Sequence, residues 1–511
     1  MGAACVVART PTTSATEGDI MAEAAINREF DTRLADPELW SERDWVAGEW
    51  VAEGGRIPVV DPATGDILGH VPAAGPATMR RAIDAAAAAL PAWAALTPDE
   101  RAERLLAWYE GMRGHREDLA RIMTLEEGKP LAEARGEIDY AASFVRWFAE
   151  EGRRTSGETI PSHLPGRRLS TVRRPVGVTA AITPWNFPSA MVTRKAAAAL
   201  AAGCPMIVRP ASETPFSALA LARLAERAGI PGGVFQVVTG DGRTLAAELM
   251  RDVRVRALSF TGSTEVGKAL IRQSADTVKR LTLELGGNAP FVVFDDVDLD
   301  AAVAGALAAK FQTSGEDCLA ANRILVQRPL YARFLERFAA ATARLRVGHG
   351  LAEDTEIGPL IDERAVAKAA AHVADARRLG ARVLAGGEAL GGHFYAPTVL
   401  ADVTPEMAVF REETFSPVAA VMPFDDEAEA IRLANDTEYG LVAYCYTRDL
   451  ARAARVGDAL DYGMLAVNCV KLTGPPIPFG GVKQSGQGRE GSRHGLDEYS
   501  EIHYTCLALP A

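Results

Sequence analysis

Hydrophobic positions along this chain follow two different periods, and the period changes near residue 176. Before that point the spacing is helical: Leu105, Tyr109 and Met112 follow an N-cap sequence at 97–100, and a second apolar stripe occupies positions 138, 141, 145 and 148. After it, helical stretches such as 218–228 and 364–379 alternate with short, β-rich apolar runs. The runs lie at 176–182, 206–208, 234–238, 257–260, 281–285, 291–294, 324–326, 418–421, 441–446 and 465–467. Such alternation is typical of parallel sheets covered by helices, so the pattern predicts an α/β fold.

Length and composition fit a globular chain of several lobes. At about 150 residues per domain, 511 residues suggest three lobes, and 48% hydrophobic with 24% charged residues excludes a largely disordered chain. A net charge of -12 argues against nucleic-acid or anionic-membrane partners. The apolar stretch 196–208 is too short to span a bilayer and contains Gly203 and Pro205. We expect a cytoplasmic protein without a signal peptide, and a loosely packed or disordered arm over 1–38 in which Met21 is an alternative start.

The six cysteines are widely scattered along the chain. No Cys-x-x-Cys pair and no His-Glu-x-x-His motif is present, so we predict neither a disulfide framework nor a metal site. A reducing compartment fits this usage best.

Three glycine-containing stretches resemble phosphate loops. The stretch 486–491 has the letters of the dinucleotide fingerprint, but it follows no predicted strand. The stretch 262–269 is almost a P-loop, although Ala269 replaces the hydroxyl residue that would hold magnesium, so a nucleoside triphosphatase is the rival enzyme class. The same glycines also fit a strand–turn–helix in which Gly262 presents backbone N–H groups and a helix N-terminus to a dinucleotide phosphate.

Four motifs decide between these interpretations. They are Pro-Trp-Asn-Phe-Pro at 184–188, Glu-Leu-Gly-Gly at 284–287, Gly-Glu-Asp-Cys at 315–318 and Pro-Phe-Gly-Gly at 478–481. In this order they resemble the aldehyde dehydrogenase superfamily, over essentially all of the chain from about residue 40. Within it, 182–190, 259–265 and 480–486 are most similar to the NAD(P)-dependent succinate-semialdehyde dehydrogenases. The resemblance implies an atypical Rossmann cofactor lobe, an α/β catalytic lobe and a small β oligomerisation flap.

The resemblance gives four residues catalytic roles, and their chemistry fits. A thiolate at Cys318 would add to an aldehyde carbonyl, and hydride would leave the resulting thiohemiacetal. The Asn186 amide and the Cys318 N–H are candidate donors to the oxyanion, with Lys195 assisting nearby. Glu284 is the expected general base for hydrolysis of the thioester, which favours water over coenzyme A as the acyl acceptor.

The resemblance also implies a nicotinamide cofactor. Its site residues are expected to be Trp185, Thr261, Gly262, Ser263 and Gly267 near the pyrophosphate, and Glu413 and Phe415 at the nicotinamide ribose and ring. NAD-selective relatives have Glu where Ser212 stands, and Arg209 can pair with a 2′-phosphate. We therefore predict that NADP is preferred and that NAD is also usable. The neighbouring Glu213 would oppose this preference by repelling the 2′-phosphate. Ser416 stands where a glycine is usual, so this loop is expected to be slightly rearranged.

The expected substrate is an acidic semialdehyde such as succinate semialdehyde, with Phe187 in its pocket. Arg154 matches one of the arginines that bind the substrate carboxylate in the relatives. Gln312 stands in place of a second such arginine, and it lacks the charge and the forked geometry of a guanidinium group. Lys471 or Thr473 could replace that contact. The alternative is a pocket for a longer, aromatic or uncharged aldehyde.

Two departures surround the nucleophile. Ala320 occupies a position where some relatives have a second cysteine, so we predict no intraloop disulfide switch. Glu316 and Asp317 replace the usual Gln and Thr, and an inward carboxylate would raise the pKa of Cys318.

The motifs assign the lobes as 39–151 with 173–285 for the dinucleotide, 286–478 for catalysis, and 152–172 with 493–511 for the flap. Homodimers or homotetramers are expected. A catalytically silent relative with a binding role is the non-enzymatic alternative, and intact Cys318, Glu284 and Asn186 argue against it.

Overall fold

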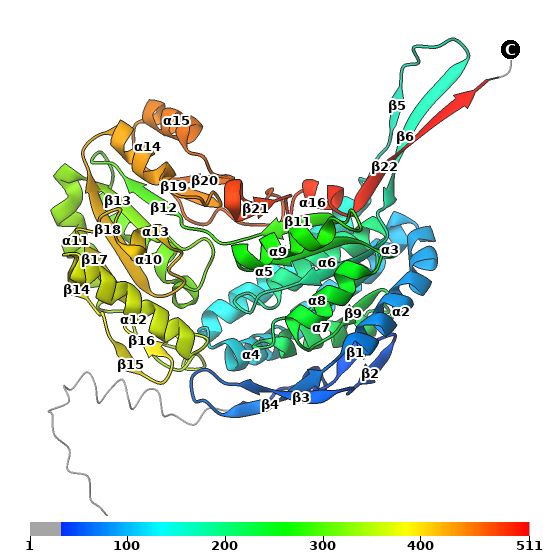
Figure 1. The fold of residues 1–511 in the computed structure, drawn as a ribbon, viewed down its shortest axis with the longest axis horizontal. Helices are drawn as coiled ribbons and strands as arrows, with labels where there is room; N and C mark the ends of the chain where they lie inside the picture. Colours follow the sequence, from blue (N-terminus) through cyan, green and yellow to red (C-terminus); the bar gives the residue numbers. More distant parts are fainter. Residues whose placement is uncertain (1–31, 510–511) are drawn as a thin grey trace, which may run out of the picture.

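The computed structural model describes residues 32–509 of the chain. Two α/β lobes lie side by side, and a narrow three-stranded sheet projects from one of them (Figure 1). The C-terminal stretch that contains β21 (Gly486–Gln487) and α16 (His494–Asp497) runs back over the first lobe. As a result, residues far apart in the sequence meet where the lobes face each other.

The first lobe is built on an eight-stranded sheet in the order β2-β1-β9-β8-β7-β10-β11-β21. Its five central strands are parallel, whereas β1 and β21 pair antiparallel at the two sides. Strand order reverses between β7 and β10, and open α/β sheets bind ligands at the carboxyl ends of the strands beside such a point. The strands are β1 (Asp44–Val46), β2 (Glu49–Val51), β7 (Val178–Ile182), β8 (Met206–Arg209), β9 (Phe235–Val237), β10 (Val255–Thr261) and β11 (Arg280–Glu284).

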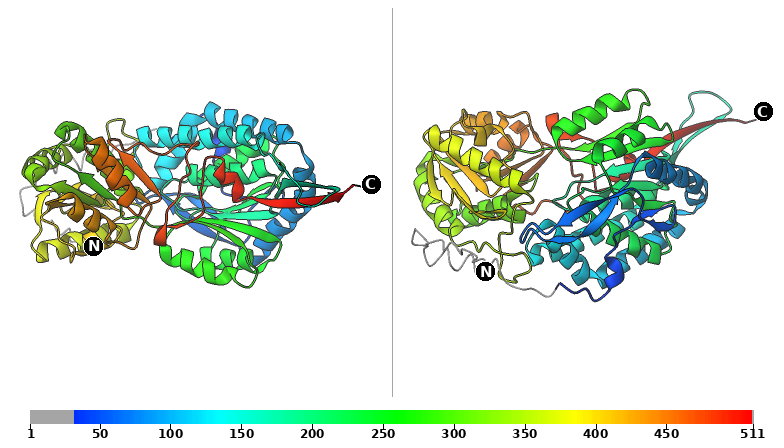
Figure 2. Two further views of the ribbon diagram at one scale, coloured as in Figure 1. Left: turned by 90° about the horizontal axis from the view of Figure 1, so that it is seen from above. Right: turned by 60° about the horizontal axis from the view of Figure 1, so that its bottom comes forward.

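Helices cover both faces of this sheet (Figure 2). They are α2 (Pro76–Ala95), α3 (Pro98–Gly114), α4 (Arg116–Glu127), α5 (Leu131–Gly152), α6 (Ala190–Ala202), α7 (Pro215–Arg227), α8 (Gly242–Arg251) and α9 (Thr264–Ser274). The predicted capping box at the start of α3 is present, with Thr97 accepting from the Glu100 N–H. Helix α6 is apolar around nearly its whole circumference and is buried between the sheet and α5.

The prediction of a helical region before residue 176 is incomplete. Four short strands precede α2, including the hairpin of β3 (Gly55–Val60) and β4 (Ile67–Ala73). Strand β3 is mostly exposed, so its apolar pattern is too weak to predict from sequence.

The second lobe contains a seven-stranded sheet in the order β14-β17-β18-β13-β12-β19-β20. All neighbours are parallel except β14. Its strands are β12 (Pro290–Val293), β13 (Arg323–Gln327), β14 (Arg382–Ala385), β17 (Thr398–Ala401), β18 (Val418–Phe424), β19 (Val442–Tyr446) and β20 (Met464–Val467), with a hairpin of β15 (Ala389–Gly391) and β16 (Phe394–Tyr395) beside them. The helices are α10 (Leu299–Phe311), α11 (Arg328–Thr342), α12 (Glu363–Arg378), α13 (Ala408–Arg411), α14 (Glu427–Asn435) and α15 (Leu450–Ala459).

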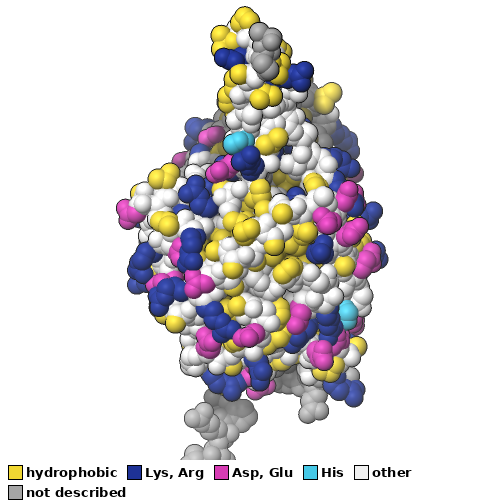
Figure 3. Space-filling view, turned by 90° about the vertical axis from the view of Figure 1, so that its right-hand side faces the viewer, with side chains coloured by type: hydrophobic (Ala, Val, Ile, Leu, Met, Phe, Trp, Pro, Cys, Tyr) yellow, Lys and Arg dark blue, Asp and Glu magenta, His cyan; other side chains and the backbone are white. Residues whose placement is uncertain are grey.

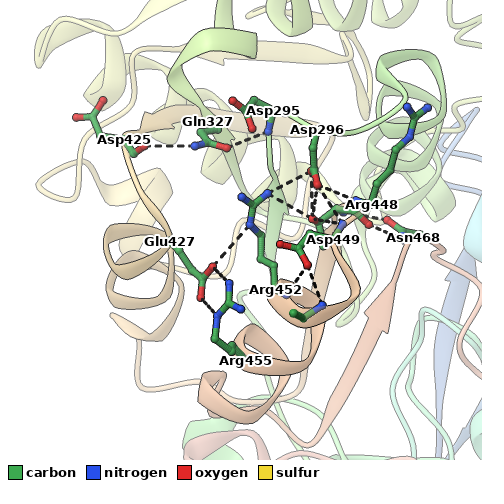
Figure 4. A network of polar contacts seen from close by, with 12 residues as sticks. Asp295, Asp296, Gln327, Asp425, Glu427, Arg448, Asp449, Arg452, Arg455 and Asn468 are labelled. Atoms are coloured by element: carbon green, nitrogen blue, oxygen red, sulfur yellow. Dashed lines mark hydrogen bonds and ion pairs between the residues drawn. The ribbon is translucent and has the colours of Figure 1, made fainter.

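A polar network fastens the outer loops of this second sheet (Figure 4). The Asp296 carboxylate accepts hydrogen bonds from the backbone N–H groups of Arg448 and Asp449, both at 3.1 Å. Arg452 reaches Asp296 at 3.3 Å, and Arg455 pairs with Glu427 at 2.7 Å. This network joins α14, α15 and the turn after β12.

The projecting sheet, here called the flap, has the order β22-β6-β5. Strand β22 (Ser500–Ala508) pairs with β6 (Arg167–Pro175), and β6 pairs with β5 (Glu158–Ile160). Figure 3 shows apolar side chains on the flap, where Ile502, Tyr504 and Leu507 are more than half exposed. Within residues 32–509, no helix has the length and apolar character needed to cross a membrane.

Candidate active site

Four strands of the first sheet end at the same edge and deliver the predicted site residues there. In the ladder, Ile182 at the end of β7 lies beside Arg209 of β8, and Thr261 of β10 lies beside Glu284 of β11. Asn186 lies in the turn after β7, and Ser263 follows β10. Parallel strands align their carboxyl ends, which explains why motifs about 100 residues apart converge.

Cys318 follows α10 and the short 3₁₀ turn η2 (Gln312–Gly315). Thr313 and Ser314 in this turn have φ values of 49° and 53°, a left-handed conformation that side chains rarely adopt. The Thr313 N–H donates to the Glu133 carboxylate of α5 at 2.8 Å, which holds the turn in place. Gly315 packs against the carbonyl of Ser416 so closely that any β-carbon there would overlap it.

The Cys318 thiol is half-buried. Burial raises its pKa, and the carboxylates of Asp317, Glu413 and Glu284 raise it further, while Arg194 opposes them. Among the carboxylates, Asp317 acts most strongly on the thiol, in line with the inward orientation considered from the sequence. Glu316 points elsewhere, because its Oε1 accepts from the Ile361 N–H at 3.3 Å.

Asn186 lies against the nucleophile loop. Its Nδ2 donates to the carbonyl of Glu316 at 2.9 Å, which uses one of the two amide hydrogens. Among the described residues, the backbone N–H of Cys318 has no hydrogen-bond acceptor. Two donors are therefore free beside the thiol, the arrangement needed to bind an oxyanion.

Glu284 ends β11 as a buried carboxylate. Neither of its oxygens has a hydrogen-bond partner within residues 32–509. Burial raises its pKa well above the usual range, and the nearby Glu490 raises it further. Gly480 lies directly beside it, since a β-carbon there would come 2.9 Å from Glu284 Oε1. A desolvated carboxylate without a protein partner is suited to accept a proton from water.

Lys195 and Arg194, both on α6, share the carboxylate of Glu490. Lys195 Nζ donates to Glu490 Oε1 and, at 2.7 Å, to the Thr261 hydroxyl, while Arg194 pairs with Glu490 Oε2 at 2.8 Å. Burial lowers the pKa of Lys195. Burial also opposes the charge of Arg194, but Glu490, Tyr140, Glu284 and Cys318 together raise its pKa above the usual value.

Sequence reasoning missed Arg194 and Glu490. Arg194 is fully buried, with its guanidinium 3.9 Å from the centre of the Phe479 ring and its charge acting on Cys318 and Glu284. The signal available for Arg194 was a second basic residue beside Lys195 in an apolar helix. Glu490 lies inside the stretch 486–491, which the structure uses to close the sheet edge beside β11.

The residues expected to hold the cofactor fit a dinucleotide. Ser263 caps α9, whose positive end faces the sheet edge, and Gly267 packs against Leu285, where a side chain would clash. Arg209 Nη2 donates to Ser212 Oγ at 2.9 Å, and its buried Nε has no partner among the described residues. In the second lobe, the Glu413 carboxylate accepts a hydrogen bond from the Gly287 N–H at 2.8 Å. The rings of Phe415 and Trp185 meet edge-on, with their centres 5.6 Å apart. Burial raises the pKa of Glu413 to about 7.

Ser416, flagged by the sequence analysis, is fully buried, and its hydroxyl has no partner within the described part of the chain. The neighbouring Phe415 takes the left-handed conformation, with a φ of 49°. The loop therefore accommodates the larger residue without exposing it.

The expected substrate residues are not all brought together. Arg154 is exposed, pairs with Glu151 at 3.1 Å and lines a surface groove with Trp147 and Pro475, so it does not surround Cys318. Gln312 and Lys471 are exposed as well. Thr473 is exposed too, and the Phe187 ring centre lies 4.1 Å from the Lys129 ammonium. Arg194, not Arg154, is the guanidinium buried at the nucleophile.

Comparison with known proteins identifies the family. The aldehyde dehydrogenase family model matches residues 50–505, and the chain belongs to that family. It is an oxidoreductase with the aldehyde dehydrogenase fold, as predicted, and the triphosphatase interpretation of 262–269 is set aside.

Similar proteins act on small acidic aldehydes according to their names. The chain is 58% identical to the non-phosphorylating aspartate-semialdehyde dehydrogenase of Halomonas elongata, over 94% of this chain and 98% of the relative. It is 56% identical to the NADP(+) succinate-semialdehyde dehydrogenase of Escherichia coli, over 93% and 100% of the two chains. The crystal structure of an E. coli NADP-dependent enzyme superimposes with a TM-score of 0.93 at 56% identity, covering 93% of this chain and all of the other.

Proposed function

We propose that this chain oxidises an aldehyde with a distal carboxylate to the dicarboxylic acid and prefers NADP over NAD. The observation that carries the substrate class is Arg194, a buried cation whose Nε has no partner among the described residues and whose charge acts on Cys318. A guanidinium binds a carboxylate through two parallel hydrogen bonds. The similar proteins named for succinate and aspartate semialdehydes support the same class.

Each residue of the site has a separate part in the proposed reaction. Cys318 adds as a thiolate to the aldehyde carbon, and the Asn186 amide with the Cys318 N–H receives the developing oxyanion. The nicotinamide, when bound, accepts the hydride. Glu284 then removes a proton from the water that attacks the thioester, which releases the acid and the thiol. Lys195, fixed by Glu490 and Thr261, keeps a positive charge near these groups.

The NADP preference rests on Arg209 and Ser212. The guanidinium lies at the end of β8 beside the small Ser212 hydroxyl, and no carboxylate of residues 32–509 pairs with it. A 2′-phosphate would meet this cation without the repulsion that a Glu at position 212 would impose. Glu213, next in sequence, also acts on the Arg209 charge, so NAD remains usable.

An aldehyde panel tests the substrate class most directly. Succinic, glutaric and aspartic semialdehydes are compared with butanal and benzaldehyde, with reduced nicotinamide as the readout and both cofactors in parallel. The semialdehydes should exceed the uncharged aldehydes in kcat/KM by about 100-fold, and Arg194→Met should erase the difference through KM. Equal efficiency for butanal would favour the alternative pocket for uncharged substrates.

The flap is proposed to join copies of the chain in a homodimer or homotetramer. Strand β22 forms one edge of its sheet, and its Ile502, Tyr504 and Leu507 are exposed. A free strand edge with apolar side chains favours pairing with another chain. Light scattering should show an oligomer, and Ile502→Lys with Leu507→Lys should shift it toward smaller species.

A further inference from the structure

Lys129 is a buried lysine that the proposed chemistry leaves without a role. It lies between α4 and α5 and is 2% exposed. Its Nζ donates to Glu137 Oε2 at 2.7 Å and to the backbone carbonyl of Asn186 at 2.6 Å. A charge buried this deeply persists only where its partners are well placed, so these contacts define its geometry.

The lysine contacts two successive residues of the turn after β7. Besides the Asn186 carbonyl, its ammonium lies 4.1 Å from the centre of the Phe187 ring, within cation–π range. Its partner Glu137 uses the other oxygen to accept from the N–H groups of Ser189 and Ala190, at 3.0 and 3.1 Å. The pair therefore holds both the turn and the start of α6.

Asn186 is thus fixed at both ends. Lys129 holds its backbone carbonyl, and the carbonyl of Glu316 holds one hydrogen of its side-chain amide. Residues 183–188 belong to neither a helix nor a strand, so no ladder of backbone hydrogen bonds fixes them. The position of the remaining amide hydrogen depends on these two anchors.

We infer that Lys129, held by Glu137, is a positioning residue for oxyanion stabilisation by Asn186. It contacts neither the thiol nor the site of the aldehyde, and it acts through the backbone of the asparagine. This inference rests on the oxyanion role proposed above for Asn186. A small displacement of a hydrogen-bond donor strongly weakens the stabilisation of the oxyanion, because this stabilisation depends on a donor that is already in position.

A double-mutant cycle tests the coupling. Lys129→Met is combined with Glu137→Gln, so that both members of the Lys129–Glu137 ion pair are neutralised and the Gln oxygen still accepts from Ser189 and Ala190. Glu127, 3.9 Å from the Lys129 ammonium, loses that partner in every Lys129 variant. The rate of the first turnover, read as reduced nicotinamide, should fall by about 10- to 100-fold. In an Asn186→Ala background the same pair should cause little further loss.

A second readout separates positioning from general damage. Alkylation of Cys318 by iodoacetamide forms no oxyanion, so its rate should be unchanged in the Lys129→Met/Glu137→Gln protein. Lys279→Met is the matched control: this buried lysine donates to the carbonyls of Asp252 and Val255 at 2.5 and 2.7 Å, at the opposite edge of the sheet. It should leave the first-turnover rate unchanged.

The outcomes are distinct. An equal loss with and without the Asn186 amide, or no loss in either background, overturns the role of Lys129 alone. If Asn186→Ala itself leaves the first turnover unchanged, the oxyanion role in the proposed function fails, and this inference fails with it. Glu137→Gln alone keeps the oxygen that accepts from the Ser189 and Ala190 N–H groups, and it should show a smaller loss with the same coupling, which provides the test if Lys129→Met does not fold.

Discussion

Gly287 packs directly against the carbonyl oxygen of Cys318, so the turn that follows the base touches the loop that carries the nucleophile. A β-carbon on Gly287 would overlap that oxygen. Gly287→Ala should therefore displace the loop and lower kcat/KM by at least about 100-fold, since displacement by about 1 Å has that effect in other active sites. Steady-state kinetics and the melting temperature together measure the change.

Gly136→Ala is the control for this substitution. Gly136 lies on the exposed face of α5 with open space around it, and alanine there should stabilise the helix by about 1 kcal/mol. Activity should be unaffected. Full activity in Gly287→Ala would mean that the contact with Cys318 has no bearing on the position of the thiol.

Asp317 is expected to set the pH dependence of the nucleophile. Its carboxylate raises the pKa of Cys318, so at neutral pH it lowers the fraction of thiolate. Asp317→Asn keeps an oxygen for the Leu319 N–H and removes the charge. The pKa of Cys318 should fall, and the curve of alkylation rate against pH should move to lower pH.

Glu316→Gln provides the comparison for Asp317→Asn. The Glu316 side chain points toward the Ile361 N–H, away from the thiol. Its alkylation profile should coincide with that of the unaltered protein. A profile that is unmoved in Asp317→Asn, or one that moves equally in both variants, would contradict the assignment.

Cofactor preference should respond to one side chain at the end of β8. Ser212→Glu places a carboxylate beside Arg209, where it both pairs with the guanidinium and repels a 2′-phosphate. The kcat/KM for NADP should fall about tenfold or more while that for NAD changes little. Ser212→Ala removes the same hydrogen bond without adding charge, and should leave the ratio of the two efficiencies nearly unchanged. A ratio that moves equally in both variants would refute the electrostatic explanation.

Local signals predicted much of this site. The apolar run 281–285 ends at an acid and two glycines, so Glu284 could be placed at a strand end, and alignment of parallel strands brings it beside Thr261. The resemblance to the aldehyde dehydrogenases, carried by the short motifs around them, implied the roles of Cys318 and Asn186. Each of these predictions needed only the chain on either side of the residue.

The other residues of the site could not be predicted, because they depend on contacts between distant parts of the chain. Lys195 and Glu490 are 295 residues apart, and nothing near Glu490 in sequence indicates that it binds two cations of α6. The same limit applies to the two arginines. The resemblance points to Arg154, whereas burial against Phe479 and Glu490 distinguishes Arg194, and burial depends on the tertiary fold. Lys129 is recognisable only through its contact with Asn186, 57 residues away.

The rate of thioester hydrolysis should depend on pH through the ionisation of Glu284. Burial and Glu490 raise its pKa, and only the ionised carboxylate can accept a proton from water, so hydrolysis of the thioester should accelerate as pH rises through that raised pKa. Steady-state rates under conditions where hydrolysis limits turnover measure this. A rate independent of pH across the titration of Glu284 would contradict the role of base.

The intact mass of Glu284→Gln, quenched in acid during turnover of succinic semialdehyde with NADP, tests the central claim most directly. Hydride transfer should still proceed once per site, while steady-state turnover falls by about 100-fold or more because the base is missing. The protein should then carry one acyl group, as a thioester on Cys318. An unmodified mass together with undiminished turnover would show that oxidation does not pass through a Cys318 thioester hydrolysed by Glu284.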